Sequence, residues 1–255
     1  MSGFASYPSL KNRTVFVSGG GSGIGASIVR HFAEQGSKVG FVDLDDGASK
    51  ALVEEVKGEG YPAPLFLKCD VRDTKAFQAA ISNVAARLGA VTVLVNNAAR
   101  DDRHAIEDVT EEFWNERIAV NLRHQYFAVQ SVAPGMKKAG GGSVINLSSV
   151  SYVSMTPNLS VYQAAKAAVI GMTRGLARDL GPDLIRVNAV MPGWIMTERQ
   201  MKMWLTPESE AELMKLQCLK EKLYPPDIAR MILWLASDDS RMVTAQKFVV
   251  DGGRN

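Results

Sequence analysis

Cysteine and histidine are scarce in this sequence of 255 residues, and the few present are scattered. The two cysteines, Cys69 and Cys218, lie far apart and lack the spacing of metal ligands, so neither a disulfide nor a redox pair is expected. The three histidines, His31, His104 and His124, form no ligand pattern with them. We therefore predict no metal site.

An excess of one charge and long apolar runs are also lacking. The 29 basic and 27 acidic residues give a net charge of +2, without a basic cluster that would follow a phosphate backbone, so we expect no nucleic-acid partner. No stretch approaches the ~20 apolar residues of a membrane span, and the first residues do not resemble a secretory signal. We expect a cytoplasmic protein without membrane contact.

Linkers and internal repeats are lacking too, which favours a single domain over residues 1–255.

The sequence does contain a regular alternation of short β-branched runs and segments with helical periodicity. In residues 227–237, for example, Ile228, Met231, Ile232 and Leu235 have the spacing of one apolar helix face. Repeated strand–helix alternation predicts a doubly wound α/β fold, with parallel strands and helices on both faces of the sheet. The predicted strands are 14–18, 38–43, 63–68, 91–96, 143–148, 185–190 and 247–251.

One segment, 193–224, breaks this alternation between the sixth predicted strand and the next helix. Its length of about 30 residues exceeds that of an ordinary connection, so we expect it to form a lid. Within it, Thr206 is a suitable N-cap, Pro207 suits the first helical position, and Glu208 favours the positive end of a helix dipole. A short helix should begin there.

A glycine-rich motif, SGGGSGIG at residues 18–25, follows the first predicted strand. Gly19 permits a tight turn, Gly23 lets the backbone approach a pyrophosphate, and Gly25 lets the helix pack closely on the strand. The position between a strand and a helix favours dinucleotide binding over a plain turn. Asp43 ends the second strand, where a carboxylate binds a ribose diol and repels a 2′-phosphate, which favours NAD. The alternative is that Asp43 only opens the following turn.

A second motif, SVYQAAKAAV at residues 160–169, places Tyr162 and Lys166 one helical turn apart. Their Cβ atoms should lie about 5–6 Å from each other on the same face. A cation there favours ionisation of the phenol, which would make Tyr162 a general base near neutral pH. By themselves the two residues are more typical of an ordinary surface pair on a helix.

Together, the glycine spacing, NNAA at 96–99, Asn121, Ser149 and the Tyr162–Lys166 pair resemble the short-chain dehydrogenase/reductase family over essentially the whole chain. The resemblance implies a Rossmann fold with a seven-stranded sheet, a homotetramer, and roles for single residues. Tyr162 would be the acid/base, Lys166 its modulator and a ribose ligand, Ser149 a substrate and tyrosine partner, and Asn121 the anchor of a relay water. The implied cofactor-binding residues are Gly19, Ser22, Gly23, Ile24, Gly25, Asp43, Asp70, Val71, Asn97, Ala98, Tyr162, Lys166, Pro192, Gly193, Ile195 and Thr197.

Two positions depart from the family pattern. Ser18 stands where threonine is usual and keeps the hydroxyl. Ala99 stands where glycine is usual, which puts a positive φ at that position in doubt.

A narrower resemblance concerns the substrate. Stretches such as NNAARDDRHAIEDVT and TERQ are similar to bacterial sugar 1-dehydrogenases of this family, which implies oxidation of an aldose at C1 to its lactone. A sugar site needs several hydrogen-bonding groups. The candidates are Ser149, Asn158, Tyr162, Gln163, Trp194, Arg199 and Gln200, with Asp101, Arg103 and His104 as either sugar contacts or an ion-pair cluster. The alternatives are a carbonyl reductase or alcohol dehydrogenase for a ketoacyl, steroid or polyol substrate, and a non-catalytic nucleotide-binding sensor.

Overall fold

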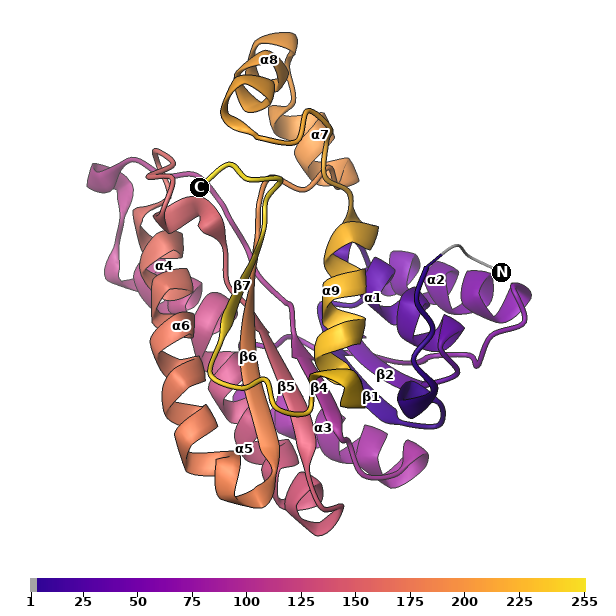
Figure 1. Cartoon of the computed structure of the whole chain (residues 1–255). Helices are drawn as coiled ribbons and strands as arrows, with labels where there is room; N and C mark the ends of the chain where they lie inside the picture. Colours follow the sequence, from indigo (N-terminus) through magenta and orange to yellow (C-terminus); the bar gives the residue numbers. More distant parts are fainter. Residues whose placement is uncertain (1–3) are drawn as a thin grey trace.

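The computed structural model describes residues 4–255, in which a seven-stranded sheet runs through the centre of the molecule (Figure 1). Every pair of neighbouring strands is parallel, in the order β3-β2-β1-β4-β5-β6-β7. The doubly wound prediction is therefore confirmed. The strands are β1 (Thr14–Ser18), β2 (Lys38–Asp43), β3 (Leu65–Lys68), β4 (Val93–Asn96), β5 (Gly142–Leu147), β6 (Ile185–Pro192) and β7 (Lys247–Val250).

The strands differ from their predicted bounds mainly at the ends. β3 begins at Leu65 and not at residue 63, because Pro64 has no N–H to donate to the sheet. β6 continues to Pro192, where the N–H of Gly193 donates to the carbonyl of Val250 in β7. β6 thus carries Pro192 to the edge of the sheet that forms the site.

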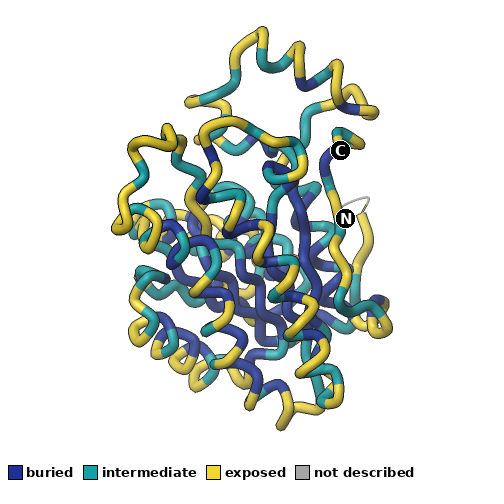
Figure 2. The backbone as a smooth tube through the Cα atoms, turned by 90° about the vertical axis from the view of Figure 1, so that its left-hand side faces the viewer, coloured by how far each residue is buried: buried dark blue, intermediate teal, exposed yellow. Residues whose placement is uncertain are grey.

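Helices cover both faces of the sheet, and alternate residues of each strand point into two separate cores. In β1, Val15 and Val17 pack with α1 and α9, whereas Phe16 packs with α3 and α5 on the opposite face. Figure 2 shows this buried interior beneath an exposed outer layer. The α-helices are α1 (Gly23–Glu34), α2 (Asp46–Gly58), α3 (Thr74–Leu88), α4 (Glu111–Ile118), α5 (His124–Lys138), α6 (Ser160–Leu180), α7 (Glu198–Trp204), α8 (Pro207–Leu216) and α9 (Pro225–Ala236).

Short turns complete the structure: the 3₁₀ turns η1 (Pro8–Leu10), η2 (Ile106–Asp108), η4 (Val150–Tyr152), η5 (Gly181–Asp183) and η6 (Asp238–Ser240), and one π-helical turn, η3 (Ala119–Arg123). Within residues 4–255, no helix combines the length and the apolar character needed to cross a bilayer.

The strand order reverses between β1 and β4, and polar ties hold the chain at this point. The Ser18 hydroxyl accepts hydrogen bonds from the N–H groups of Asn97 and Ala98, both at 3.1 Å. The Asn97 amide in turn donates to the Gly19 carbonyl at 2.8 Å. In open parallel sheets, ligands bind outside the carboxyl ends of the strands at such a reversal.

The predicted insertion rises from this same edge as α7 and α8 (Figure 1). Its two ends meet in a parallel bridge between Ile195 and Leu223, so the segment leaves the sheet and returns at one place. α8 begins at Pro207 with Thr206 as its N-cap, as the sequence predicted.

Gly40 in β2 provides a test of how tightly the helices pack on the sheet. A Cβ at this position would lie 2.4 and 2.6 Å from the two methyl groups of buried Val84 on α3. Gly40→Ala should lower the free energy of unfolding in urea by about 1–3 kcal/mol, because the core is already filled. The matched change Gly58→Ala, with no atom within 4 Å, should be neutral or stabilising. Equal stability of the two variants would contradict this packing.

Candidate active site

Two adjoining cavities open at the carboxyl edge of the sheet. One, of about 750 Å³, extends from the glycine-rich turn to Asp43 and Asp70, and we call it the glycine-loop cavity. The other, of about 610 Å³, contains Tyr162 and lies beneath the lid, and we call it the Tyr162 cavity. Ile24, Asn97, Ala99, Thr197 and Arg199 line both. An elongated ligand could therefore pass from one into the other.

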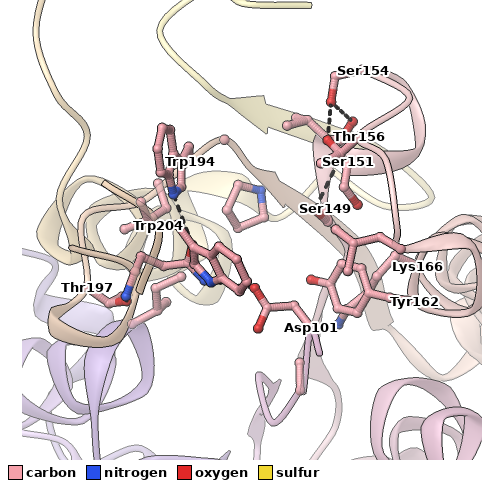
Figure 3. Close-up of a pocket in the computed structure, with 18 of the residues that line it drawn as sticks. Asp101, Ser149, Ser151, Ser154, Thr156, Tyr162, Lys166, Trp194, Thr197 and Trp204 are labelled. Atoms are coloured by element: carbon pink, nitrogen blue, oxygen red, sulfur yellow. Dashed lines mark hydrogen bonds between the residues drawn. The ribbon is translucent and has the colours of Figure 1, made fainter. Parts of the chain in front are cut away.

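The Tyr162 cavity brings Tyr162 and Lys166 together on α6 (Figure 3). The Lys166 Nζ lies 5.6 Å from the centroid of the Tyr162 ring. It also donates to the Leu147 carbonyl at 2.8 Å, and only 1% of Lys166 is exposed. The Ser148 hydroxyl donates to the main-chain carbonyl of Lys166 at 2.6 Å, which joins α6 to the end of β5 a second time.

The sequence predicts that Lys166 lowers the pKa of Tyr162, but in the structure burial has the larger effect on the pKa of both residues. Burial lowers the pKa of Lys166 to about 7, although the charge of Asp101 acts in the opposite direction. The pKa of Tyr162 is raised, by burial first and then by Asp101, while Ser149 and Arg199 act to lower it. In the protein alone, burial therefore outweighs nearby positive charge and keeps the phenol protonated.

Ser149 lies beside Tyr162, directly after β5. Its hydroxyl accepts a hydrogen bond from the N–H of Ser151 at 3.1 Å and interacts with the phenol (Figure 3). A hydroxyl held in this way can donate its own proton toward a substrate oxygen in the cavity.

Asn121 occupies the π-helical turn between α4 and α5, and its side chain is fully engaged with main chain. Its amide donates to the carbonyls of Arg100 and Arg117, both at 3.0 Å, and accepts from the N–H of Arg100 at 2.9 Å. Asn121 does not line either cavity as they are formed by residues 4–255. Its side chain therefore braces the segment after β4 against α4.

The glycine-loop cavity has the form of a cradle for a pyrophosphate. Gly19 and Gly23 have φ of +67° and +53°, and a Cβ on Gly25 would lie only 1.8 Å from the Gly19 carbonyl oxygen. Ser22 caps α1 without a side-chain hydrogen bond, so the first N–H groups of the helix remain available to an anion. These residues fit a dinucleotide. Ala99 fits beside them without a positive φ.

Carboxylates lie at the far end of this cavity. The Asp43 carboxylate accepts from the N–H of Gly21 at 2.8 Å and from that of Asp45 at 3.0 Å, which fixes its orientation. Asp70 is paired with Arg72, whose guanidinium lowers the pKa of this carboxyl. The expected cofactor residues divide between the two cavities. Gly19, Ser22, Gly23, Ile24, Gly25, Asp43, Asp70, Val71, Asn97, Ala98 and Thr197 line the glycine-loop cavity, and Tyr162, Lys166, Pro192, Gly193 and Ile195 line the Tyr162 cavity.

An ion-pair cluster ties the lid to the segment after β4. Arg199 on α7 contacts Asp101 at 2.9 Å and Asp102 at 3.0 Å, and Gln200 donates to Asp101 at 2.8 Å. The Gln200 carbonyl accepts from the Trp194 indole at 3.0 Å (Figure 3). Arg199 and Gln200, the expected substrate contacts of this segment, line the Tyr162 cavity, and they also make the pairs of this cluster.

The other expected substrate residues separate into two groups. Ser149, Asn158, Tyr162, Trp194 and Arg103 line the Tyr162 cavity. Gln163 does not, which corrects the prediction: its amide donates to the carbonyls of Ser151 at 2.9 Å and Thr156 at 2.6 Å and so clamps the loop behind the site. His104 is likewise outside the cavity wall, within 3.1 Å of the Ser160 hydroxyl.

Sequence reasoning missed several polar residues of this cavity, among them Ser151, Trp204 and Arg254. Ser151 lies two residues after Ser149, in the turn η4, and no motif distinguishes it. Trp204 and Arg254 belong to no motif, and only the tertiary structure brings the lid and the C-terminal segment to the cavity.

The chain shares its whole length with known dehydrogenases. A family model described as enoyl-(acyl carrier protein) reductase matches residues 19–255. A probable galactose dehydrogenase of Rhizobium meliloti (strain 1021) is 51% identical over 247 residues, 97% of this chain and 96% of that one. A D-xylose 1-dehydrogenase of Caulobacter vibrioides (strain NA1000 / CB15N) is 50% identical over 249 residues, 98% of each chain. A solved 7α-hydroxysteroid dehydrogenase, complexed with NADH and 7-oxo glycochenodeoxycholic acid, matches with a TM-score of 0.91 at 30% identity over 96% of each chain.

The chain therefore belongs to the short-chain dehydrogenase/reductase family, as its motifs indicated. It is an oxidoreductase that acts on CH–OH groups of a small molecule with a nicotinamide cofactor.

The buried lysine generates a prediction about stability and pH. An unfolded lysine titrates near its ordinary pKa of 10.5, whereas Lys166 in the fold titrates at about 7. Between these values the unfolded chain binds more protons, so this residue makes the free energy of unfolding rise with pH, by at most about 1.4 kcal/mol per pH unit. Lys166→Met should lack this contribution. Urea unfolding of both proteins between about pH 7 and 9.5 tests it, and parallel pH profiles would contradict it.

Proposed function

We propose that this protein oxidises an aldose at C1 to the aldonolactone and reduces NAD. The observation that carries the proposal is the placement of Tyr162 and Lys166 in a polar cavity that adjoins the glycine-loop cavity. The two sugar dehydrogenases that are 50–51% identical over nearly the whole chain support an aldose substrate.

The proposed chemistry needs a proton acceptor at the anomeric oxygen and a hydride acceptor at C1. Tyr162 accepts the proton of the anomeric hydroxyl, and Ser149 holds the same oxygen through a hydrogen bond. A nicotinamide cofactor, when bound, accepts the hydride from C1. Because the protein alone raises the pKa of Tyr162, its ionisation requires additional positive charge near the phenol. Lys166, whose Nζ lies 5.6 Å from the centroid of the Tyr162 ring, supplies such charge when it is protonated.

The residues at the far end of the glycine-loop cavity support NAD over NADP. The Asp43 carboxylate is fixed by two main-chain N–H groups and lies on the cavity wall, followed by Leu44 instead of a basic residue. A fixed carboxylate there accepts hydrogen bonds from a ribose diol and repels a 2′-phosphate. Arg72, the nearest basic residue in sequence on this wall, is already paired with Asp70 and Glu116.

Turnover of a substrate panel tests the function directly. Purified protein incubated with NAD and then NADP over aldoses, polyols, hydroxysteroids and 3-hydroxyacyl substrates should produce reduced nicotinamide most efficiently with NAD and an aldose. Tyr162→Phe should lower kcat by about 10²- to 10⁴-fold and leave NAD binding intact, because only the proton acceptor is lost. Tyr126→Phe, on an exposed face of α5, is the matched control. Oxidation of a steroid or hydroxyacyl substrate alone would refute the aldose assignment.

The cofactor preference has its own test. Asp43→Asn should lower the ratio of kcat/KM with NAD to kcat/KM with NADP by at least about tenfold, because the charge that repels the 2′-phosphate is removed. Asp46→Asn removes an exposed carboxylate three residues away that pairs with Lys50 and is not on the cavity wall. Steady-state kinetics with both cofactors measure the ratio. An unchanged ratio in Asp43→Asn would exclude Asp43 as the discriminating residue.

A further inference from the structure

Three buried polar atoms without a hydrogen-bond partner in residues 4–255 belong to residues that line the Tyr162 cavity. They are the Ser151 Oγ, the Trp204 Nε1 and the Arg254 Nε. Nearly all buried polar atoms in folded proteins are paired, so three such atoms around one cavity call for a common explanation. They come from three separate segments: the turn after β5, the lid and the C-terminal segment.

Each of these side chains is held in place by contacts that leave its polar atom free. The guanidinium of Arg103 lies 4.9 Å from the centroid of the Trp204 ring, which fixes the indole without using its N–H. Figure 3 shows Trp204 on the lid side of the cavity, Ser151 near Ser149 and Tyr162 on the opposite side, and Asp101 between the two sides. The N–H of Ser151 is bonded to Ser149 and its carbonyl to Gln163, while its hydroxyl is unpaired.

Arg254 is placed by a well-fixed C-terminal turn. The buried carboxylate of Asp251 accepts from the N–H groups of Gly253 at 2.8 Å and Asn255 at 3.0 Å. The carbonyl of Gly253 accepts from the N–H of Cys218, at the end of the lid. The guanidinium of Arg254 has neither a hydrogen bond nor an ion pair within the part of the chain that the structure describes. A cation on a cavity wall without an acidic partner is available to a ligand.

The chemistry of the three groups defines what they bind. The indole and the guanidinium can only donate, whereas a serine hydroxyl donates and accepts. Their common ligand must therefore present several oxygen acceptors on one small molecule. An aldose whose C1 is at Tyr162 presents its remaining hydroxyls to the rest of the cavity.

We propose that Ser151, Trp204 and Arg254 form a polyol subsite that binds the sugar oxygens remote from C1 and so determines which aldose is oxidised. This inference rests on the proposed function and adds the residues that select the substrate. The same donors suit the carboxylate of a hexuronate, whose C1 is equally oxidisable, so the test includes both sources of oxygen.

Three single-residue substitutions test the subsite. Trp204→Phe removes the N–H and keeps a ring for Arg103, Ser151→Ala removes the hydroxyl, and Arg254→Met keeps the aliphatic stem. We expect kcat/KM for the preferred sugar to fall about 3- to 10-fold for the first two and about 10- to 100-fold for Arg254→Met, mostly through KM. The KM for NAD and the melting temperature should stay at the wild-type values. Trp114→Phe, Ser131→Ala and Arg241→Gln, all outside both cavities, are the matched controls.

Deoxy sugars separate a direct contact from a structural effect. If Trp204 binds one hydroxyl, Trp204→Phe should lose nothing further toward the deoxy analogue that lacks that hydroxyl, as in a double-mutant cycle. A loss in Arg254→Met that is larger for a hexuronate than for the neutral aldose identifies a carboxylate as the partner of Arg254, and an equal loss identifies a hydroxyl. Equal penalties of each variant toward every deoxy analogue would overturn the subsite.

The wild-type panel separates failure of this inference from failure of the proposed function. Wild-type oxidation of aldoses with unchanged kcat/KM in all three variants would overturn the subsite and leave the function standing. If the wild-type protein oxidises no aldose or hexuronate, the proposed function fails, and the subsite fails with it.

Discussion

The buried ammonium of Lys166 is the interaction on which the geometry of the site depends. Burial of a charged group is costly unless it is paired or hydrogen-bonded, and Lys166 is 1% exposed with a main-chain carbonyl as its only direct acceptor within residues 4–255. The cost is visible in its pKa of about 7. In return, the bond from Lys166 to Leu147 fixes the start of α6 against the end of β5. Tyr162, one turn earlier, can then face the cavity in one orientation.

Other polar side chains at the carboxyl edge of the sheet also form hydrogen bonds with the main chain, as Lys166 does. The cavities lie between the segments that these bonds hold. Ser18 and Asn97 tie β1 to the segment after β4, and Asn121 ties that segment to α4. Gln163 clamps the loop after β5. These residues lie close to the chemistry, and the hydrogen bonds named here hold the walls of the cavities in place.

The sequence predicts the elements that depend on neighbouring residues, but not the partners of polar side chains that distant residues supply. Short β-branched runs and the glycine turn are local patterns, so β1, β2 and the cradle around Gly25 were predictable from neighbouring residues. The direction in which a polar side chain points depends on partners that are distant in the sequence. Arg199 and Asp101 are 98 positions apart, so no local pattern indicates that the Arg199 guanidinium is paired with this carboxylate. Gln163 follows Tyr162 directly, but on a helix the next residue points about 100° away, toward the loop.

The lid shows the same dependence on distant contacts. Leu213 is the buried residue of α8, so apolar packing contributes little, and the half-exposed pairs of Arg199 are individually weak. Main-chain bonds at two places add to them: Met196 bonds to Leu223 at the base, and Cys218 and Leu219 bond to the two glycines of the C-terminal turn. Trp204 and Arg254 are thus carried by segments bonded to each other. These bonds therefore couple the position of the lid to that of the C-terminal turn.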